Sequence, residues 1–319
     1  MTTQRTEAPG SPAPGSPRSA AKPPHSARSV ANARRRQRLV EVWTEFRKSP
    51  SGLFGLIFLI IVILLAILAP VIADRSLLDV TQIDNAANEP PSMQNPLGTD
   101  PSGRSVLVML LWGSRVSLMV GVAATAMSMV IGTVVGMAAG HFGGLGGALL
   151  MRVVDFFLVL PSLVLAIVLS SVLQRGVWTI VIAIGITSWA GTARVVRSQT
   201  LTIESRSYIE RSLALGAGHR HIIGRHVLPA VMPLVMANTT LTVGAAIIAE
   251  STLSFLGLGD TTQTSWGSML KLSMDSGAAT GGYWWFVLPP GLAIVVVVLA
   301  FTLVGRAFES VINPTLRGR

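Results

Sequence analysis

Six long apolar stretches without a charged side chain constrain the fold of this chain more than any other feature. They cover residues 52–72, 116–140, 156–174, 176–193, 227–249 and 284–304. A helix needs roughly 20 apolar residues to cross about 30 Å of hydrocarbon, and each stretch is close to that length. The sequence therefore predicts an all-α polytopic membrane protein with six transmembrane helices, the third kinked at Pro161.

The composition agrees with a membrane protein and excludes several kinds of chemistry. Only 13% of the 319 residues are charged, whereas about a quarter are charged in soluble proteins. The chain has no cysteine, so it can form neither a disulfide nor a cysteine-bound metal or iron–sulfur site. Any binding or catalytic site in this chain must therefore use residue types other than cysteine.

No familiar nucleotide or metal motif is present. None of the lysines follows a glycine, as the lysine of a phosphate-binding loop does, and the glycine-rich residues 140–147 are interpreted as a turn between spans. His219, His221 and His226 are close in sequence but lack the i,i+4 spacing of a zinc-binding helix, so we interpret them as surface residues. We predict no catalytic residues, no metal site and no cofactor bound by this chain.

The basic residues are concentrated before the first apolar stretch. Ten of the 25 lysines and arginines precede residue 49, and the segment is rich in proline, serine, alanine and glycine. We predict a disordered basic tail over residues 1–38, followed by a juxtamembrane helix and the first span over residues 39–72. The arginines of residues 34–38 are interpreted as an anchor on anionic membrane lipid, and no nucleic-acid partner is predicted.

Charged residues in the connections predict the orientation. Six arginines lie in the connection 194–226, whereas the segment 73–115 carries five acidic residues against Arg75 and Arg104, with Arg115 at the border of the second stretch. Cytoplasmic connections are enriched in lysine and arginine. The segments 194–226 and 306–319 and both termini are therefore predicted to be cytoplasmic, and the segments 73–115 and 257–282 external.

The connection between the fourth and fifth spans carries a recognisable motif. It contains Glu210, a glycine six residues later at Gly216, and Leu228-Pro229 at the start of the next span. This pattern resembles the EAA loop of ABC-importer permeases, with Arg211 and Ser212 in place of the usual two alanines. Physically it predicts a short helix, a glycine turn and a second helix that ends where proline begins a span.

Two external motifs resemble the dipeptide/oligopeptide/nickel branch of the same family, in particular its C-type inner-membrane subunit. One is Leu97-Gly98-Thr99-Asp100-Pro101-Ser102-Gly103-Arg104, and the other runs from Ala249-Glu250-Ser251 to Gly257-Leu258-Gly259 and is followed by Ser265-Trp266-Gly267. The resemblance covers residues 45–316 and implies a type I-like permease bundle with a cytoplasmic coupling helix. It divides the chain further into a permease core over residues 116–305, with the coupling loop 194–226, and a C-terminal tail over residues 306–319.

The resemblance also implies function and partners. It predicts a permease subunit of the bacterial cell membrane that forms half of a path for di- or oligopeptides. Its expected partners are a homologous permease subunit in a heterodimer, two cytoplasmic ATPase subunits that use ATP and magnesium, and an extracellular solute-binding protein. The residues predicted to couple to the ATPase are Glu210, Leu213, Ala214, Gly216, His226, Leu228 and Pro229, with Ile209 and Leu215 as further apolar contacts; the external or gating candidates are Gly98, Asp100, Gly103, Arg104, Glu250 and Gly257.

Two other classes of membrane protein fit the sequence less well. An ion-coupled secondary transporter needs ionisable residues inside its spans, and Glu250, near an outer end, is almost the only one here. The alternative reading of Glu250 is a helix-end residue that reaches water. An intramembrane enzyme needs a nucleophile and a base at membrane depth, but no histidine lies within a predicted span.

Overall fold

A computed structural model describes residues 40, 43–83 and 85–312, and the helices named below lie in the unit that begins at Thr44. The predictions for the tail 1–38 and for residues 313–319 lie outside these described residues. Over the described residues the chain is helical, with one isolated bridge between Thr99 and Ser105 and no strand.

Five helices are long and apolar enough to cross a membrane, and a sixth span results if one sharply bent helix pair is counted as a span. The bent pair consists of α4 (Gly144–Val159) and α5 (Ser162–Val172). The five long helices are α2 (Pro50–Ile72), α3 (Val106–His141), α6 (Val177–Glu204), α9 (Leu228–Phe255) and α11 (Trp284–Ile312). The shorter elements are η1 (Arg75–Leu78), α7 (Ser207–Ala214), α8 (His219–Ile222), the π-helix η2 (Ile223–Val227) and α10 (Trp266–Asp275).

The third apolar stretch does not form one helix, which corrects the predicted span 156–174. The chain turns by 87° between α4 and α5, so the kink predicted at Pro161 is confirmed and is a complete break. Proline has no N–H to donate and disfavours a helical conformation in the residue before it. Leu160 is accordingly extended, with φ −79° and ψ 131°.

Two element boundaries also differ from the predicted ones. Helix α3 begins at Val106, inside the segment predicted to be external, and α6 continues through Arg194 and Arg197 to Glu204. The connection between the fourth and fifth spans is therefore shorter than residues 194–226. The glycine-rich turn is shorter as well, because Gly140 belongs to α3.

Small residues allow α3 and α6 to pack closely. Gly132, Gly136 and Gly140 repeat at every fourth position of α3 and face α6. A Cβ atom on Gly136 would lie 2.5 Å from the carbonyl oxygen of Ala193, and one on Gly140 would lie 2.8 Å from the side chain of Thr200. Such spacing of small residues is typical of helices that approach closely in membranes.

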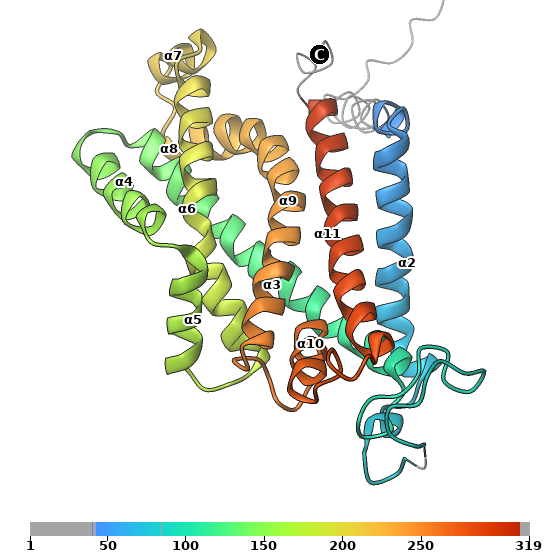
Figure 1. Ribbon diagram of the computed structural model, residues 1–319. Coiled ribbons are helices and arrows are strands. Elements are labelled where there is room, and N and C mark those ends of the chain that lie inside the picture. Colours follow the sequence, from blue (N-terminus) through green and yellow to red (C-terminus); the bar gives the residue numbers. More distant parts are fainter. Residues whose placement is uncertain (1–39, 41–42, 84, 313–319) are drawn as a thin grey trace, which may run out of the picture. The chain divides into compact units, whose positions relative to one another are not determined.

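The other long helices pack by the same means. A Cβ atom on Gly121 of α3 would lie 2.5 Å from Ile247 of α9, and one on Gly55 of α2 would lie 2.8 Å from the carbonyl oxygen of Ala300 of α11. Figure 1 shows α9 beside α3 and α11 beside α2. The helices thus form one continuous set of contacts from α6 to α2.

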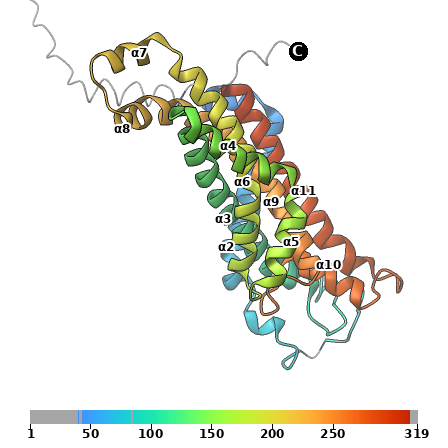
Figure 2. The ribbon, with the colours of Figure 1, turned by 90° about the vertical axis from the view of Figure 1, so that its left-hand side faces the viewer.

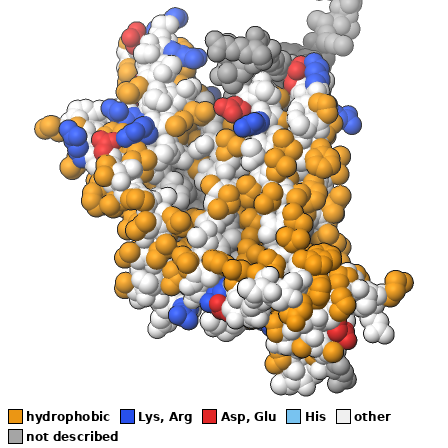
Figure 3. Space-filling view, viewed as in Figure 1, with side chains coloured by type: hydrophobic (Ala, Val, Ile, Leu, Met, Phe, Trp, Pro, Cys, Tyr) orange, Lys and Arg blue, Asp and Glu red, His pale blue; other side chains and the backbone are white. Residues whose placement is uncertain are grey.

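The connections are sorted to the two ends of the bundle. Figures 1 and 2 show α7 at the same end as the last turns of α11, while α10 and the segment 73–105 lie at the opposite end. Hydrophobic side chains cover the middle of the face in Figure 3, and most charged side chains lie toward its ends. This distribution matches a helix bundle that spans a bilayer.

Candidate functional site

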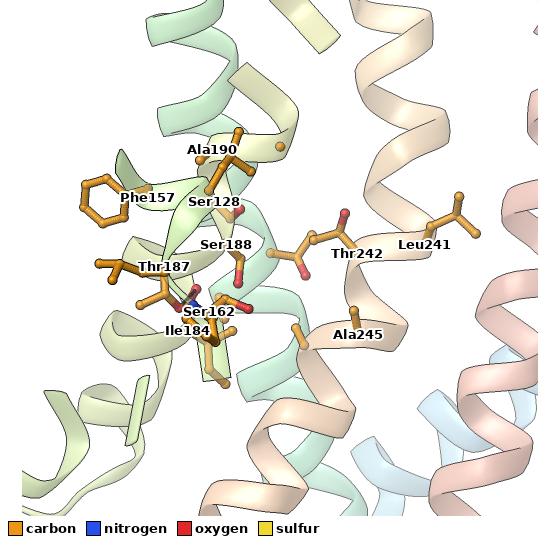
Figure 4. A pocket seen from close by; sticks show the side chains of 17 residues that line it. Ser128, Phe157, Ser162, Ile184, Thr187, Ser188, Ala190, Leu241, Thr242 and Ala245 are labelled. Atoms are coloured by element: carbon orange, nitrogen blue, oxygen red, sulfur yellow. Dashed lines mark hydrogen bonds between the residues drawn. The ribbon is translucent and has the colours of Figure 1, made fainter. Parts of the chain in front are cut away.

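A pocket of about 570 Å³ lies where α4 breaks from α5. Figure 4 shows Ser162 at the start of α5 and Ser188 of α6 on one side, with Thr242 and Ala245 of α9 opposite. Its walls come from α3, the α4–α5 break, α6 and α9. The lining residues are Ala124, Thr125, Ser128, Phe157, Leu158, Leu160, Pro161, Ser162, Ile184, Thr187, Ser188, Ala190, Gly191, Leu241, Thr242, Ala245 and Ala246.

The lining of the pocket is mainly apolar, with six hydroxyl-bearing residues and no charged side chain. Two of the hydroxyls are already used, because Thr187 donates to the carbonyl oxygen of Ala183 (2.8 Å) and Thr242 donates to that of Asn238 (2.9 Å). Two others, on Thr125 and Ser128 of α3, have no hydrogen-bond partner among the described residues. A mainly apolar surface with a few hydroxyls and no charge binds a solute weakly enough for it to leave again.

The amino-acid sequence alone does not predict this pocket. Two features of the sequence are related to the pocket. Pro161 lies at the helix break, and the second apolar stretch, residues 116–140, is rich in small and hydroxyl-bearing residues. Hydropathy alone does not say which faces of three separate helices meet at a break. The pocket therefore emerged only from the packing.

The predicted coupling segment, which the structure limits to residues 207–227 from α7 to η2, has the expected helix and glycine turn. Helix α7 ends at Ala214, and Gly216 follows with a φ of +84°. Two bonds close the turn, from Gly216 N–H to the carbonyl oxygen of Leu213 (2.9 Å) and from Ala217 N–H to that of Ser212 (3.1 Å). No atom lies within 4 Å of a Cβ built on Gly216, so the glycine is needed for its backbone conformation and not for a close approach.

The faces of α7 differ in exposure. Ile209 is only 1% exposed and packs in a cluster with Ile203 and Ile222, so its predicted role as an ATPase contact is wrong. Leu213 and Leu215 are 51% and 89% exposed. Glu210 and Ala214 are also exposed, and the ion pairs among the described residues do not include Glu210. An apolar, solvent-facing end of a helix next to a buried anchor can receive a partner.

The second part of the coupling segment does not end before the span. Helix α8 continues through the π-helix η2 directly into α9, and Pro229 lies in the first turn of α9. Proline cannot donate a backbone hydrogen bond, and it is tolerated in the first turn of a helix, where Pro229 lies. His226 packs its ring 5.8 Å from that of Tyr208, while Leu228 is half-buried beside it.

Two side-chain hydrogen bonds in series link the coupling segment to two of the long helices. His141, at the end of α3, is hydrogen-bonded through Nδ1 to Glu204, the last residue of α6, and through Nε2 to Nδ1 of His219 (2.8 Å). His219 is the first residue of α8 and is exposed, as predicted, but it also carries this hydrogen bond, which the sequence did not indicate. The described residues contain no group of three or more ligands arranged for a metal ion. The link therefore connects α3, α6 and the coupling segment mechanically.

The first external motif forms a closed turn. Asp100 is fully buried and accepts bonds from the N–H groups of Ser102 (2.9 Å) and Arg104 (2.8 Å), and its other oxygen pairs with the Arg104 guanidinium at 2.6 Å. Gly98 and Gly103 have φ values of +66° and +81°. A Cβ atom at either would lie about 2.5 Å from a carbonyl oxygen, so the turn needs glycine on both counts.

The second external motif encloses a buried carboxylate. Glu250 has no exposed surface, so the reading in which it reaches water is wrong. It accepts hydrogen bonds from Ser254 (2.8 Å), Ser251 (3.3 Å) and Ser117 of α3 (2.9 Å), and Ser117 Oγ in turn accepts from Trp266 N–H at the start of α10 (3.2 Å). Glu250 thereby joins α9 to α3 and, through Ser117, to α10.

Gly257 ends α9 close to this carboxylate. Its φ of +82° allows the N–H of Leu258 to bond back to the carbonyl oxygen of Leu253 (2.9 Å). This left-handed residue after the last helical turn is a common helix termination, and glycine adopts it without strain. The predicted motif glycine thus has a local structural role.

Comparisons with known proteins agree with this architecture. Residues 132–318 match the family described as the inner membrane component of binding-protein-dependent transport systems, and residues 38–91 match the N-terminal transmembrane domain of oligopeptide transport permease C. The chain is 35% identical over 278 residues to the dipeptide transport system permease protein of Bacillus subtilis, covering 87% of this chain and 86% of that protein.

Two further relatives have similar coverage. The oligopeptide transport system permease protein of Bacillus subtilis is 36% identical over 85% of this chain and 88% of its own length. The glutathione transport system permease protein of Escherichia coli is 34% identical over 87% and 91%. This chain therefore belongs to the family of inner membrane components of binding-protein-dependent transport systems, as a non-catalytic, multi-pass ABC permease subunit.

Proposed function

We propose that this chain forms half of a translocation path for di- or oligopeptides, and that the pair of helices α3 and α6 links this path to ATP hydrolysis. One observation carries the proposal: the same two helices line the pocket and hold the coupling segment. Their middle parts supply Thr125, Ser128 and Thr187 to the pocket, and their ends supply His141 and Glu204 to the link with His219.

The close packing of α3 on α6 makes this link mechanically effective. The backbones of these two helices are in close contact at three successive glycines, and such close-packed interiors transmit displacement from one helix to the other. A displacement of α7 and α8 therefore reaches the pocket as a rigid-body movement, as alternating access requires. We assign the ATPase contact to Leu213, Ala214 and Leu215, with Gly216 setting their position.

In the proposed complex, partner proteins bind at both ends of this helix bundle. A homologous permease subunit supplies the other half of the path in a heterodimer, and two ATPase subunits use ATP and magnesium beneath the coupling segments. An extracellular binding protein delivers the peptide to the end that carries α10. The names of the relatives, which include dipeptide and oligopeptide permeases, support peptides as the cargo.

Uptake of labelled dipeptides and oligopeptides tests the function. Cells that carry the complete transporter are expected to take up peptide, and deletion of this chain should abolish the uptake. Depleting ATP while an ion gradient is maintained should stop it, and a protonophore with ATP present should not. Uptake that follows the ion gradient and ignores ATP would identify a secondary transporter instead.

The orientation also forms part of the proposal. Because arginines are concentrated in the connection after α6 and acidic residues after α2, the coupling segment and both termini should be cytoplasmic. A reporter fused after Arg319 is expected to be active in the cytoplasm, and a tag at Asn88 should be labelled from outside intact cells. The reverse labelling pattern would overturn this orientation.

A further inference from the structure

We propose that the pocket binds the carboxylate end of the passing peptide, at the break between α4 and α5. This inference rests on the proposed function, since it names the group of the peptide that the pocket takes. Three features carry it: the free N-terminal turn of α5, two unpaired hydroxyls on α3, and a lining without charge.

The first feature is the start of α5. This helix has 11 residues, and Leu160, Pro161 and Ser162 at its N-terminal end all line the pocket. No side chain among the described residues caps it, and its first backbone bond runs from Leu165 N–H to the carbonyl oxygen of Pro161 (3.1 Å). The N–H groups before Leu165 have no partner within the helix, and they belong to the end of α5 that borders the pocket, where the positive end of the helix dipole favours an anion.

The second feature is independent of the helix end. Thr125 and Ser128 are each only 1% exposed, they line the same pocket, and their hydroxyls have no partner among the described residues. A buried hydroxyl without a partner is costly, so a ligand that accepts hydrogen bonds is stabilised there. These hydroxyls can each donate one hydrogen bond, and the N–H groups of α5 can only donate, so together they offer several donors to one ligand.

The third feature selects among ligands. An ionised carboxylate only accepts hydrogen bonds, so it matches a set of donors, whereas an ammonium group only donates. The lining contains no aspartate or glutamate to hold an ammonium group and no lysine or arginine to hold the carboxylate tightly. Binding through dipoles and hydroxyls is weak enough for release, and transport requires release.

The test uses the double variant Thr125→Val/Ser128→Ala in the complete transporter, reconstituted in proteoliposomes. At subsaturating concentration, uptake of dialanine is expected to fall at least about tenfold, because hydrogen bonds to a charged group are lost. Uptake of dialanine amide, which lacks the carboxylate, should change less than about twofold. The binding protein is the same in every sample, so its own preference cancels when variants are compared.

The matched control is the double variant Thr133→Val/Ser170→Ala. Thr133 lies on α3 and Ser170 on α5, and both hydroxyls are buried and unpaired among the described residues, but neither lines the pocket. This control removes the same atoms from similar surroundings. Its uptake of both peptides is expected to stay within about twofold of the unmodified transporter.

A second measurement does not depend on transport. Millimolar dialanine is expected to raise the melting temperature of the detergent-solubilised complex and of the control variant, and dialanine amide should not. Loss of this shift in the Thr125→Val/Ser128→Ala variant supports the proposal. An equal loss of uptake for both peptides, or a thermal shift that persists in this variant, overturns it. Absence of ATP-dependent peptide uptake in the unmodified transporter would instead refute the proposed function.

Discussion

Replacing Gly136 with leucine is expected to separate α3 from α6 and to remove most of the folded protein from the membrane. A Cβ atom at this position would lie 2.5 Å from the carbonyl oxygen of Ala193 and 2.8 Å from the Cβ of Val196. The nearest obstacle is backbone, so no side-chain rotation can relieve the clash. Overpacking of this kind costs roughly 3 kcal/mol, which is a large fraction of the stability of a domain.

The measurements are the amount of chain in the membrane and the melting temperature of the solubilised protein. Gly146→Leu is the matched control, because Gly146 lies in α4 and a Cβ there meets no atom within 4 Å. The control should be close to the unmodified protein in both measurements. If Gly136→Leu is equally abundant and equally stable, the close packing of α3 on α6 does not hold the bundle together.

The helical fold could be predicted from the sequence because the property that determines it is local. Uncharged apolar stretches of sufficient length must form helices in a bilayer, whatever they pack against. The break at Pro161 was predictable for the same reason, since proline alters the hydrogen bonding of its own turn. The start of α3 was missed because Arg115 interrupts the apolar residues, so the uncharged stretch was counted only from Val116, although residues 106–112 are themselves apolar.

The less predictable features depend on residues far apart in the chain. Glu250 meets Ser117, which lies 133 positions earlier, and His219 meets His141, 78 positions earlier. The motif glycines were recognised as a pattern, but their reasons differ: Gly98 and Gly103 combine a positive φ with lack of space, whereas Gly216 has ample space. The motifs therefore identified these glycine positions, but only the backbone geometry shows why each of them requires glycine.

Gly216→Val is expected to uncouple the permease from its ATPase while the membrane bundle stays intact. Valine is branched at Cβ and is strongly disfavoured at the φ of +84° that closes the turn after α7. A strain of about 2 kcal/mol lowers the population of this turn roughly thirtyfold. Leu213 and Leu215 then no longer present their exposed side chains in the arrangement that we propose for docking.

The membrane bundle should tolerate this variant, because a Cβ on Gly216 meets no atom within 4 Å and the effect stays local. The chain should reach the membrane in normal amount and pair with its partner permease, but it should lose co-purified ATPase, peptide-stimulated ATP hydrolysis and peptide uptake. Gly218→Val is the matched control: Gly218 is equally open, but its φ of −76° and ψ of 162° suit valine. If both variants couple normally, or both fail alike, the conformation of Gly216 does not position the ATPase contact.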